Sequence, residues 1–279
     1  MVQKQSISGV SLAIRKTMAS YLDKSPLIEK TKPSEFTIKI ANTLEERQAV
    51  FHLGYQVYLE KGYIKENSNE WMIQNYDSNS ETTILMVLDK QKNIVGSVTL
   101  VFDGSSRLPA EKIYGEELRA LRKQNEKIVE ISRLVIDPQY RNSKEILVLL
   151  FNSLYIYSYF VKNYTCLAIE VNPRHTAYYQ ALLNFRTIGA EKPCPTVQSA
   201  PAILMYVPLK HAQDEVLRIS KNTEPEKNNR SLYKYFIKPE QQSLVAYYLE
   251  KQAKPMTADE KIYFGFSESG LNRAMCVAE

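Results

Sequence analysis

The sequence predicts an α/β fold, with a mixed central sheet, helices on both faces, an N-terminal helix and a C-terminal helical extension. The main observation is that short, apolar, strand-type segments alternate with helix-type segments between residues 36 and 209. The flanking residues are polar or have helical periodicity only. We therefore expect three parts, at residues 1–35, 36–210 and 211–279.

The composition is typical of a soluble globular protein. Hydrophobic residues make up 44% of the 279 residues and charged residues 24%, and the net charge is only +5. This small basic excess gives no reason to expect nucleic acid binding, and no apolar run is long enough to cross a bilayer. The three cysteines lack metal-ligand spacing, which favours reduced thiols and a cytoplasmic location.

The first elements come before residue 103. Residues 6–22 have apolar side chains at fourfold spacing, which predicts an amphipathic helix packed on the domain, with peripheral membrane contact as the alternative. A polar linker follows, and then FTIKI predicts a strand. LEERQAVFHLGYQVYLEKG predicts a helix that Gly62 ends. TTILMVLD and IVGSVTLVF predict two strands joined by a turn.

The later elements complete the sheet. Residues 110–127 predict a helix, and a strand through Glu130 follows. The strongest helical pattern covers residues 143–163, with Asn142 and Glu145 as a capping box. CLAIEV predicts a strand, and Asn172 is the expected cap of the next helix. Residues 185–189 and 201–209 predict the last strands, and the tail after residue 210 predicts partly packed helices.

The segment EISRLVIDPQYRNSK places Glu130, Ser132 and Arg133 inside an apolar strand. In a regular strand Glu130 and Ser132 share one face, and Arg133 lies on the other. A buried carboxylate is costly unless it is paired or protonated. Glu130 is therefore either part of a salt bridge or a base whose pKa burial raises.

Two further segments carry polar residues at helix starts. The turn after the Glu130 strand leads into a helix N-terminus, where backbone amides with Arg141 and Lys144 can hold one phosphodiester. An ordinary strand-to-helix turn is the alternative. In NPRHTAYYQALLNF, a tyrosine at 178 or 179 can protonate a leaving group or pack in the core with its hydroxyl bonded.

Together these segments resemble known acyltransferases. The strand, turn and helix order resembles the GNAT superfamily, and EISRLVID is similar to the Glu-x-Ser-Arg signature of acyl-homoserine-lactone synthases. SRLPAEKIYGEELRALRKQNEKIVEISRLVIDPQYR and NPRHTAYYQALLNFRTIGAEKPCP more closely resemble the bacterial long-chain N-acyl amino acid synthases. The resemblance covers about residues 43–209 and leaves the tail unexplained.

The resemblance implies a GNAT-like enzyme that moves a fatty acyl group from acyl carrier protein to the α-amine of an amino acid. The turn lacks the glycines of coenzyme-A-dependent GNAT enzymes, which fits a carrier-bound phosphopantetheine donor, with acyl-coenzyme A as the alternative. No bound cofactor or metal is expected, because amine attack on a thioester needs positioning, a base and an oxyanion site. Basic residues at 141, 144 and 162 are expected to dock the acidic carrier.

The resemblance also implies residue roles. Glu130 is the expected general base, and Tyr179 is the expected acid. The expected thioester and oxyanion site consists of the backbone at Leu134, Val135 and Ile136. The expected phosphopantetheine site consists of Gln139, Tyr140, Arg141, Asn142 and Ser143. The expected acceptor site consists of Ser132, Arg133, Arg174 and His175. The acyl chain is expected in an apolar channel near the late helices.

Two other functions stay open at this point. An acyl-homoserine-lactone synthase needs acidic residues for the adenosylmethionine cation, and here Asp77 matches without a second acid nearby. A non-catalytic lipid-binding module would keep the channel without the chemistry. The intact Glu130 and Ser132 favour an enzyme over this module.

Overall fold

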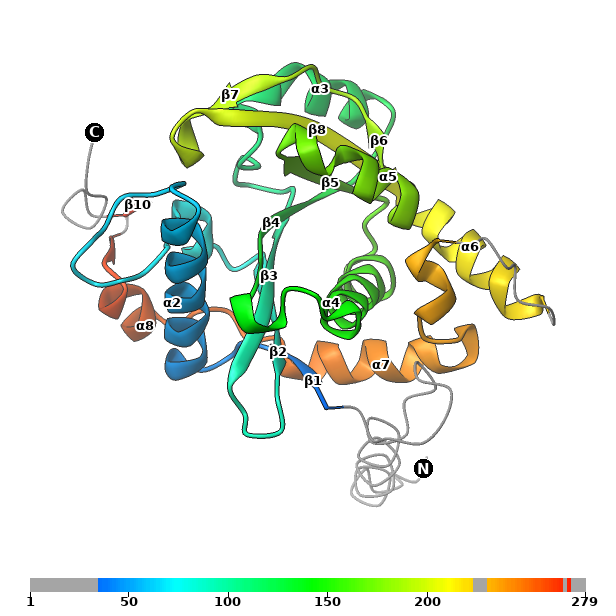
Figure 1. The fold of residues 1–279 in the computed structure, drawn as a ribbon, viewed down its shortest axis with the longest axis horizontal. Helices are drawn as coiled ribbons and strands as arrows, with labels where there is room; N and C mark the ends of the chain where they lie inside the picture. The colour runs from blue at the N-terminus through cyan, green and yellow to red at the C-terminus, as the bar shows by residue number, and fades with distance from the viewer. Residues whose placement is uncertain (1–34, 223–229, 268–269, 272–279) are drawn as a thin grey trace, which may run out of the picture.

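The predicted α/β fold is confirmed in a computed structural model of the chain, which describes residues 35–222, 230–267 and 270–271. The predicted N-terminal helix at residues 6–22 lies outside the described residues. A mixed sheet forms the centre, with helices on both faces (Figure 1). Its strands are β1 (Thr37–Ile40), β2 (Thr82–Leu88), β3 (Ile94–Phe102), β4 (Ile128–Ile136), β5 (Cys166–Val171), β6 (Arg186–Thr187), β7 (Lys192–Cys194) and β8 (Ala200–Pro208).

The strands follow the order β1-β2-β3-β4-β5-β8-β6, and β7 also pairs with β8. Among the described strands, only β4 and β5 pair in parallel. The sequence pattern did not predict β7, because its three residues are too short for a periodic signal. The helices are α2 (Leu44–Glu60), α3 (Glu111–Lys123), α4 (Lys144–Ile156), α5 (Thr176–Leu183), α6 (Leu209–Lys221), α7 (Pro239–Gln252) and α8 (Ala258–Tyr263).

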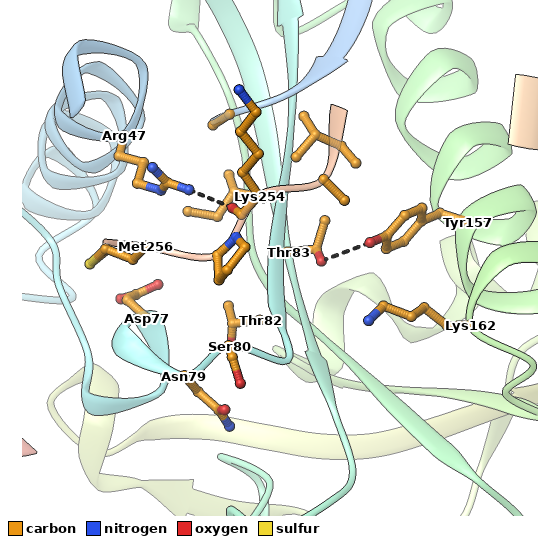
Figure 2. A pocket seen from close by; sticks show the side chains of 15 residues that line it. Arg47, Asp77, Asn79, Ser80, Thr82, Thr83, Tyr157, Lys162, Lys254 and Met256 are labelled. Atoms are coloured by element: carbon orange, nitrogen blue, oxygen red, sulfur yellow. Dashed lines mark hydrogen bonds between the residues drawn. The ribbon is translucent and has the colours of Figure 1, made fainter. Parts of the chain in front are cut away.

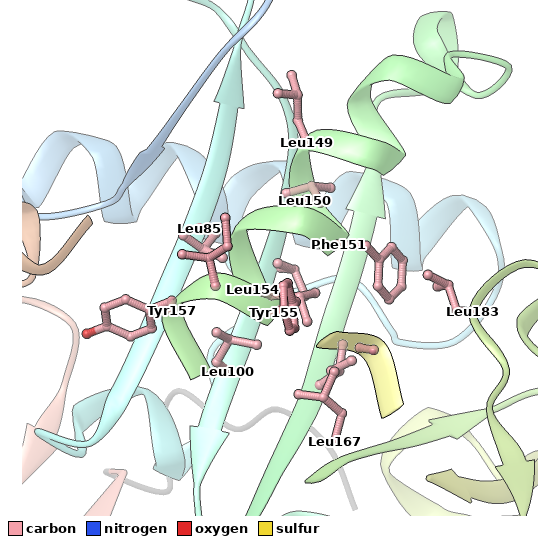
Figure 3. Packing of buried hydrophobic residues seen from close by; sticks show 14 of the residues in the cluster. Leu85, Leu100, Leu149, Leu150, Phe151, Leu154, Tyr155, Tyr157, Leu167 and Leu183 are labelled. Atoms are coloured by element: carbon pink, nitrogen blue, oxygen red, sulfur yellow. The ribbon is translucent and has the colours of Figure 1, made fainter. Parts of the chain in front are cut away.

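Two hydrophobic layers cover the sheet. On one face, Leu85 and Leu100 of the strands pack against Leu150 and Leu154 of α4 (Figure 3). On the other face, α2 and α3 cover the sheet with separate clusters. The stretch from residue 144 to residue 161 is apolar enough for a membrane span, but 72% of it is buried inside the protein. This stretch is therefore the central core helix of the fold.

Local signals set the helix ends, with two corrections. Gly62 has a φ of +67° just after α2, as expected for a helix stop. The predicted capping box at Asn142 is wrong, because the Ser143 side chain accepts the hydrogen bond from the Ile146 amide and caps α4. The predicted helix at 143–163 also changes character, since α4 ends at Ile156 and a π-helical turn, η3 (Tyr157–Val161), follows.

The C-terminal extension is helical, as predicted, and it packs into the main core. The expected boundary at residue 210 falls inside α6. Phe236, Val245 and Leu249 join the same cluster as α4. Further along, buried Arg47 of α2 forms an ion pair with Glu260 and donates to the Lys254 carbonyl at 2.7 Å. The end of the described chain therefore returns to the opposite face and stabilises α2.

Candidate active site

The site lies where two neighbouring strands separate. β4 and β5 pair from Ile128 with Cys166 to Ile131 with Ile169, although β4 continues to residue 136. A cavity of about 680 Å³ lies beside the unpaired part. Ile131 and Ile169 line it together with Leu134 and Ile136 further along β4. The cavity therefore reaches the backbone of a strand edge that no other strand of the described chain covers.

A β-bulge in β4 decides which side chains face which helices. Thr99 pairs with Ser132, and Ser97 pairs with Val135, so β4 contains one extra residue here. Arg133 lies in the bulge with a φ of +41°. The bulge turns Arg133 toward the α2 face, the same side as Glu130. The prediction that Arg133 lies on the face opposite Glu130 is therefore wrong.

Glu130 is buried, with only 3% of its surface exposed, and it lines the cavity. Its Oε2 atom accepts a hydrogen bond from the Ala110 amide at 2.9 Å. Burial raises the pKa of Glu130 from 4.5 to about 8, against the lowering effect of that hydrogen bond. The Glu130 carboxyl forms no ion pair with any described residue, which disfavours the salt-bridge alternative. The carboxylate form of Glu130 can accept a proton near neutral pH.

Tyr179 approaches the same cavity from the α4 face. It extends from α5, and its ring contacts Phe151 and Phe185 edge to face. Burial raises the pKa of Tyr179 well above its usual value, so the phenol stays protonated. Its hydroxyl makes no hydrogen bond to the described residues. The structure therefore disfavours the alternative in which Tyr179 packs in the core with its hydroxyl bonded.

Backbone directions separate the three residues expected at the oxyanion site. The Asp137 amide donates to Val95 of β3 at 2.9 Å. Because amide directions alternate along a strand, the Val135 amide also faces β3, and the Leu134 and Ile136 amides face the gap. Leu134 and Ile136 line the cavity, whereas the Val135 side chain is buried among Leu53 and Val57 of α2. The backbone amides of Leu134 and Ile136 therefore remain candidates for the oxyanion site, and the amide of Val135 does not.

The buried guanidinium of Arg133 is fully engaged by the protein. It donates to the Asp77 carboxylate, to the Met72 carbonyl at 2.7 Å and to Thr99 at 2.9 Å. Asp77 is buried as well. An arginine with these partners has little capacity left for a substrate carboxylate, so its expected role in acceptor binding has no support in the geometry. Ser132 shares a hydrogen bond of 2.9 Å with the Tyr76 hydroxyl and still lines the cavity.

Lys61, Arg141 and Arg174 are cationic residues that line the cavity, together with Glu60. Arg174 is exposed and donates to the Tyr63 hydroxyl at 3.2 Å and to the His175 ring at 3.1 Å. Burial, with the nearby charges of Arg174 and Lys61, lowers the pKa of His175. Arg141 also lines the cavity and pairs with Glu60. The mouth is therefore suited to anionic groups.

The turn expected to bind phosphopantetheine uses most of its own amides. Gln139 donates to the Asp137 side chain at 2.8 Å, and Tyr140 donates to the Asp137 carbonyl at 2.8 Å. The amides of Arg141 and Ser143 donate to carbonyls within the turn. Among the five expected residues, only Arg141 lines the cavity. The Asn142 amide makes no hydrogen bond to the described residues, so it remains available to a ligand.

Several polar residues of this cavity were not predicted from the sequence. Tyr58 of α2, Glu170 of β5 and Cys194 of β7 all line it. Burial raises the pKa of Tyr58 to about 12 and that of Cys194 to about 11. Glu170 was visible in CLAIEV as a lone acid in an apolar strand, the same signal that revealed Glu130.

A second, smaller cavity of about 130 Å³ lies under the C-terminal segment. Asp77, Lys254 and Met256 lie around it in Figure 2. Lys162, one of the expected carrier-docking residues, also lines this cavity. The cavity lies apart from the mouth between β4 and β5, and it contains neither Glu130 nor Tyr179.

Comparisons with known proteins identify the family of this chain. The family model described as "N-acyl amino acid synthase FeeM" matches residues 49–208, which is more than half of the chain. The chain belongs to this family. The N-acyl amino acid synthase family accounts for β2 to β8 and the residues of the cavity, and α6 to α8 lie beyond the match. A comparison with curated protein sequences found no match.

Several solved structures are similar to this chain. The chain is similar to FeeM, an N-acyl amino acid synthase from uncultured soil microbes, with 25% identity and a TM-score of 0.55 over 63% of this chain and 92% of FeeM. The acyl-homoserine-lactone synthase LasI matches with 16% identity and a TM-score of 0.50 over 63% and 91% of the two chains. BjaI, named a CoA-dependent acyl-homoserine lactone synthase, matches with 14% identity and a TM-score of 0.50 over 65% and 88%. LasI and BjaI support the fold, and the family match shows that this protein is an acyltransferase.

Proposed function

We propose that this acyltransferase moves a fatty acyl group from acyl carrier protein to the α-amine of an amino acid and so forms an N-acyl amino acid. The observation that carries the proposal is the position of Glu130 and Tyr179. They reach one cavity from opposite faces of the sheet, on either side of the gap between β4 and β5. A thioester in this gap would have a base on one side and a proton donor on the other.

The proposed step forms a C–N bond and breaks a C–S bond. The amine nitrogen attacks the thioester carbonyl, and Glu130 accepts a proton from the nitrogen, directly or through water. The amides of Leu134 and Ile136 donate to the oxygen as it gains negative charge. Tyr179 donates a hydrogen bond to the departing sulfur, a role that its high pKa favours over complete proton transfer.

The mouth of the cavity supports a carrier-bound donor. Arg141, Arg174 and Lys61 line it, so the phosphate of phosphopantetheine would meet positive charge on entry. The turn before α4 contains no glycine and uses most of its amides internally, which leaves little room for an additional pyrophosphate. Acyl-coenzyme A is the alternative donor, because CoA-dependent BjaI shares the fold. Supply by acyl carrier protein would also place the enzyme in the cytoplasm.

Asp77 distinguishes this proposal from an acyl-homoserine-lactone synthase. A buried ion pair with Arg133 neutralises Asp77, the one acid that matches the expected adenosylmethionine site. Its carboxylate is therefore occupied within the protein. We favour a free amino acid as acceptor for this reason.

The test is mass spectrometry of lipid extracts from cells that express the full chain, with Glu130→Gln as the matched control. A fatty acid amide of an amino acid that disappears with the variant is the expected result. An N-acyl homoserine lactone would support the alternative enzyme. No new lipid, from a folded protein supplied with acyl carrier protein, would contradict the proposal and favour a lipid-binding module.

A further inference from the structure

Glu170 is a second carboxylate in the active-site cavity, and the mechanism above leaves it without a role. It lies on β5, two residues after Ala168, which pairs with Glu130 of β4. Because side chains alternate along a strand, Glu170 and Glu130 extend from the same face of neighbouring strands. Both line the cavity.

The surroundings of Glu170 compensate its charge only in part, through the nearby charge of Lys112 of α3, which lowers its pKa. It forms no ion pair with the described residues, and its neighbour is the Cys194 thiol, to which it is hydrogen bonded. Its own pKa is raised, first by burial. Its charge in turn helps raise the pKa of Glu130, after the larger effect of burial. Two partly or fully buried carboxylates on the same face of neighbouring strands, neither in an ion pair with a described residue, are costly unless a bound ligand brings positive charge.

The proton balance of amide formation indicates that this cationic ligand is the ammonium form of the acceptor amine. An amine reaches the enzyme near neutral pH as an ammonium ion with three N–H bonds, and the amide product keeps one of them. Two protons must therefore leave the nitrogen, one before attack and one during it. A single carboxylate serves one of these transfers, and a second carboxylate beside it can serve the other.

We propose that Glu170 binds the ammonium group of the acceptor beside Glu130 and accepts its first proton. The assignment rests on the proposed function and adds the charge state in which the acceptor binds. Glu170 then accepts the proton that frees the nitrogen lone pair. Glu130 accepts the proton released as the C–N bond forms. The sulfur leaves as a thiolate that Tyr179 stabilises, and both carboxyl groups return their protons to water or to that thiolate.

The kinetic test compares Glu170→Gln with Cys194→Ala. The first variant removes the charge and keeps the size of the side chain, and the second removes the hydrogen-bond partner and keeps the charge. Glu170→Gln is expected to raise KM for the amino acid by about 10- to 100-fold, the usual effect of a lost hydrogen bond to a charged group. KM for the acyl donor should change little. An equal loss in Cys194→Ala would show that Glu170 only supports the wall of the cavity.

A binding measurement separates this inference from the proposed function. Ethylammonium is titrated into protein with ¹³C-labelled glutamate carboxyl groups, followed by NMR without any acyl donor. We expect the Glu130 and Glu170 signals to move together in wild type, and binding to weaken in Glu170→Gln. Absence of ethylammonium binding would overturn the assignment even if acyl transfer is confirmed. Binding without any amide product would contradict the proposed function alone.

The same NMR experiment, run as a pH titration, measures the electrostatic interaction between Glu130 and Glu170. The charged groups that face Glu130 are Glu170 of β5 and Glu111 and Lys112 of α3. Removing the negative charge of Glu170 should lower the pKa of Glu130. An unchanged pKa in Glu170→Gln would show that the two carboxyl groups are too far apart to share one ammonium ion.

Discussion

The backbone amide of Ala110 donates a hydrogen bond to the Glu130 carboxylate at 2.9 Å. Ala110 is the N-cap of α3, so the N-terminus of this helix holds the proposed base. Tyr114 fixes this helix, because its hydroxyl donates to the Ala202 carbonyl at 2.6 Å and its ring packs on Gly189. A β-carbon at Gly189 would lie 2.5 Å from that ring, so only glycine fits there. The position of Glu130 therefore depends on contacts far from it in the sequence.

Glu130→Gln should reduce kcat/KM for acyl transfer by about 10²- to 10⁴-fold, the usual contribution of a general base. The pKa of Glu130 is about 8, so the rate of wild type should rise with pH and level off above that value. The variant should lose this dependence. The measurement is kcat/KM from pH 6 to pH 9, and an unchanged rate at neutral pH would exclude Glu130 as the base.

The same pKa predicts how stability depends on pH. The folded protein keeps the Glu130 proton up to about pH 8, whereas an unfolded chain loses it near 4.5, so folding takes up a proton between these values. This contribution to the free energy of unfolding is fully present below pH 4.5. It is lost as pH rises through 8 and amounts to a few kcal/mol in total. Urea unfolding of Glu130→Gln should show a smaller decrease between pH 5 and pH 8 than wild type, and parallel curves would contradict the prediction.

Tyr179→Phe should lower kcat by about 10- to 100-fold with little change in thermal stability. The variant loses the hydrogen bond to the departing sulfur and keeps the ring contacts with Phe151 and Phe185. Tyr178→Phe is the matched control, because Tyr178 is the neighbouring residue and is 46% exposed. Equal losses in both variants would show that neither hydroxyl has a specific role.

Asp77→Asn should destabilise the protein by about 3–5 kcal/mol, because it leaves the charge of Arg133 buried and uncompensated. The exposed pair of Arg141 and Glu60 is the control, and Glu60→Gln should cost about 1 kcal/mol or less. Urea unfolding measures both. A mild effect of Asp77→Asn on stability, with a large increase in KM for the amino acid, would return Arg133 to the acceptor site.

Arg141→Glu with Lys144→Glu should raise KM for acyl carrier protein, because Arg141 lies in the turn before α4 and Lys144 is its first residue, where we expect the carrier to dock. Lys144 Nζ lies 3.8 Å from the ring centre of Tyr235, so the C-terminal extension borders this surface. A small pantetheine thioester should be affected far less, since no carrier surface is involved. Added salt should weaken the wild-type reaction with the carrier in the same direction.

The control for this prediction is Lys123→Glu with Lys251→Glu, which makes the same change in net charge at exposed positions of α3 and α7. Equal losses with both donors in the first double variant would assign Arg141 and Lys144 to phosphate binding or to folding. No loss with either donor would place the carrier elsewhere on the protein.

Local patterns in the sequence identified much of this site. Glu130 stood out because it is an acid in an apolar strand, and Tyr179 because it follows a capped turn. Glu170 produced the same signal as Glu130, so it too could have been found from the sequence. The cap of α4 was misplaced by one residue, because Asn142 and Ser143 both suit that position and only the backbone geometry distinguishes them.

The sequence by itself determined the order of the longer helices and strands, because hydrophobic periodicity is a local property of the chain. Tertiary structure alone decided which groups meet. The bulge that turns Arg133 toward Asp77 depends on pairing between β3 and β4, and the amide that holds Glu130 belongs to a helix twenty residues earlier. The separation of β4 from β5 after Ile131 opens the cavity, and no periodic pattern records where paired strands part. These features depend on packing between segments that are distant in the sequence. Such contacts form only in the folded protein, so no local pattern reveals them.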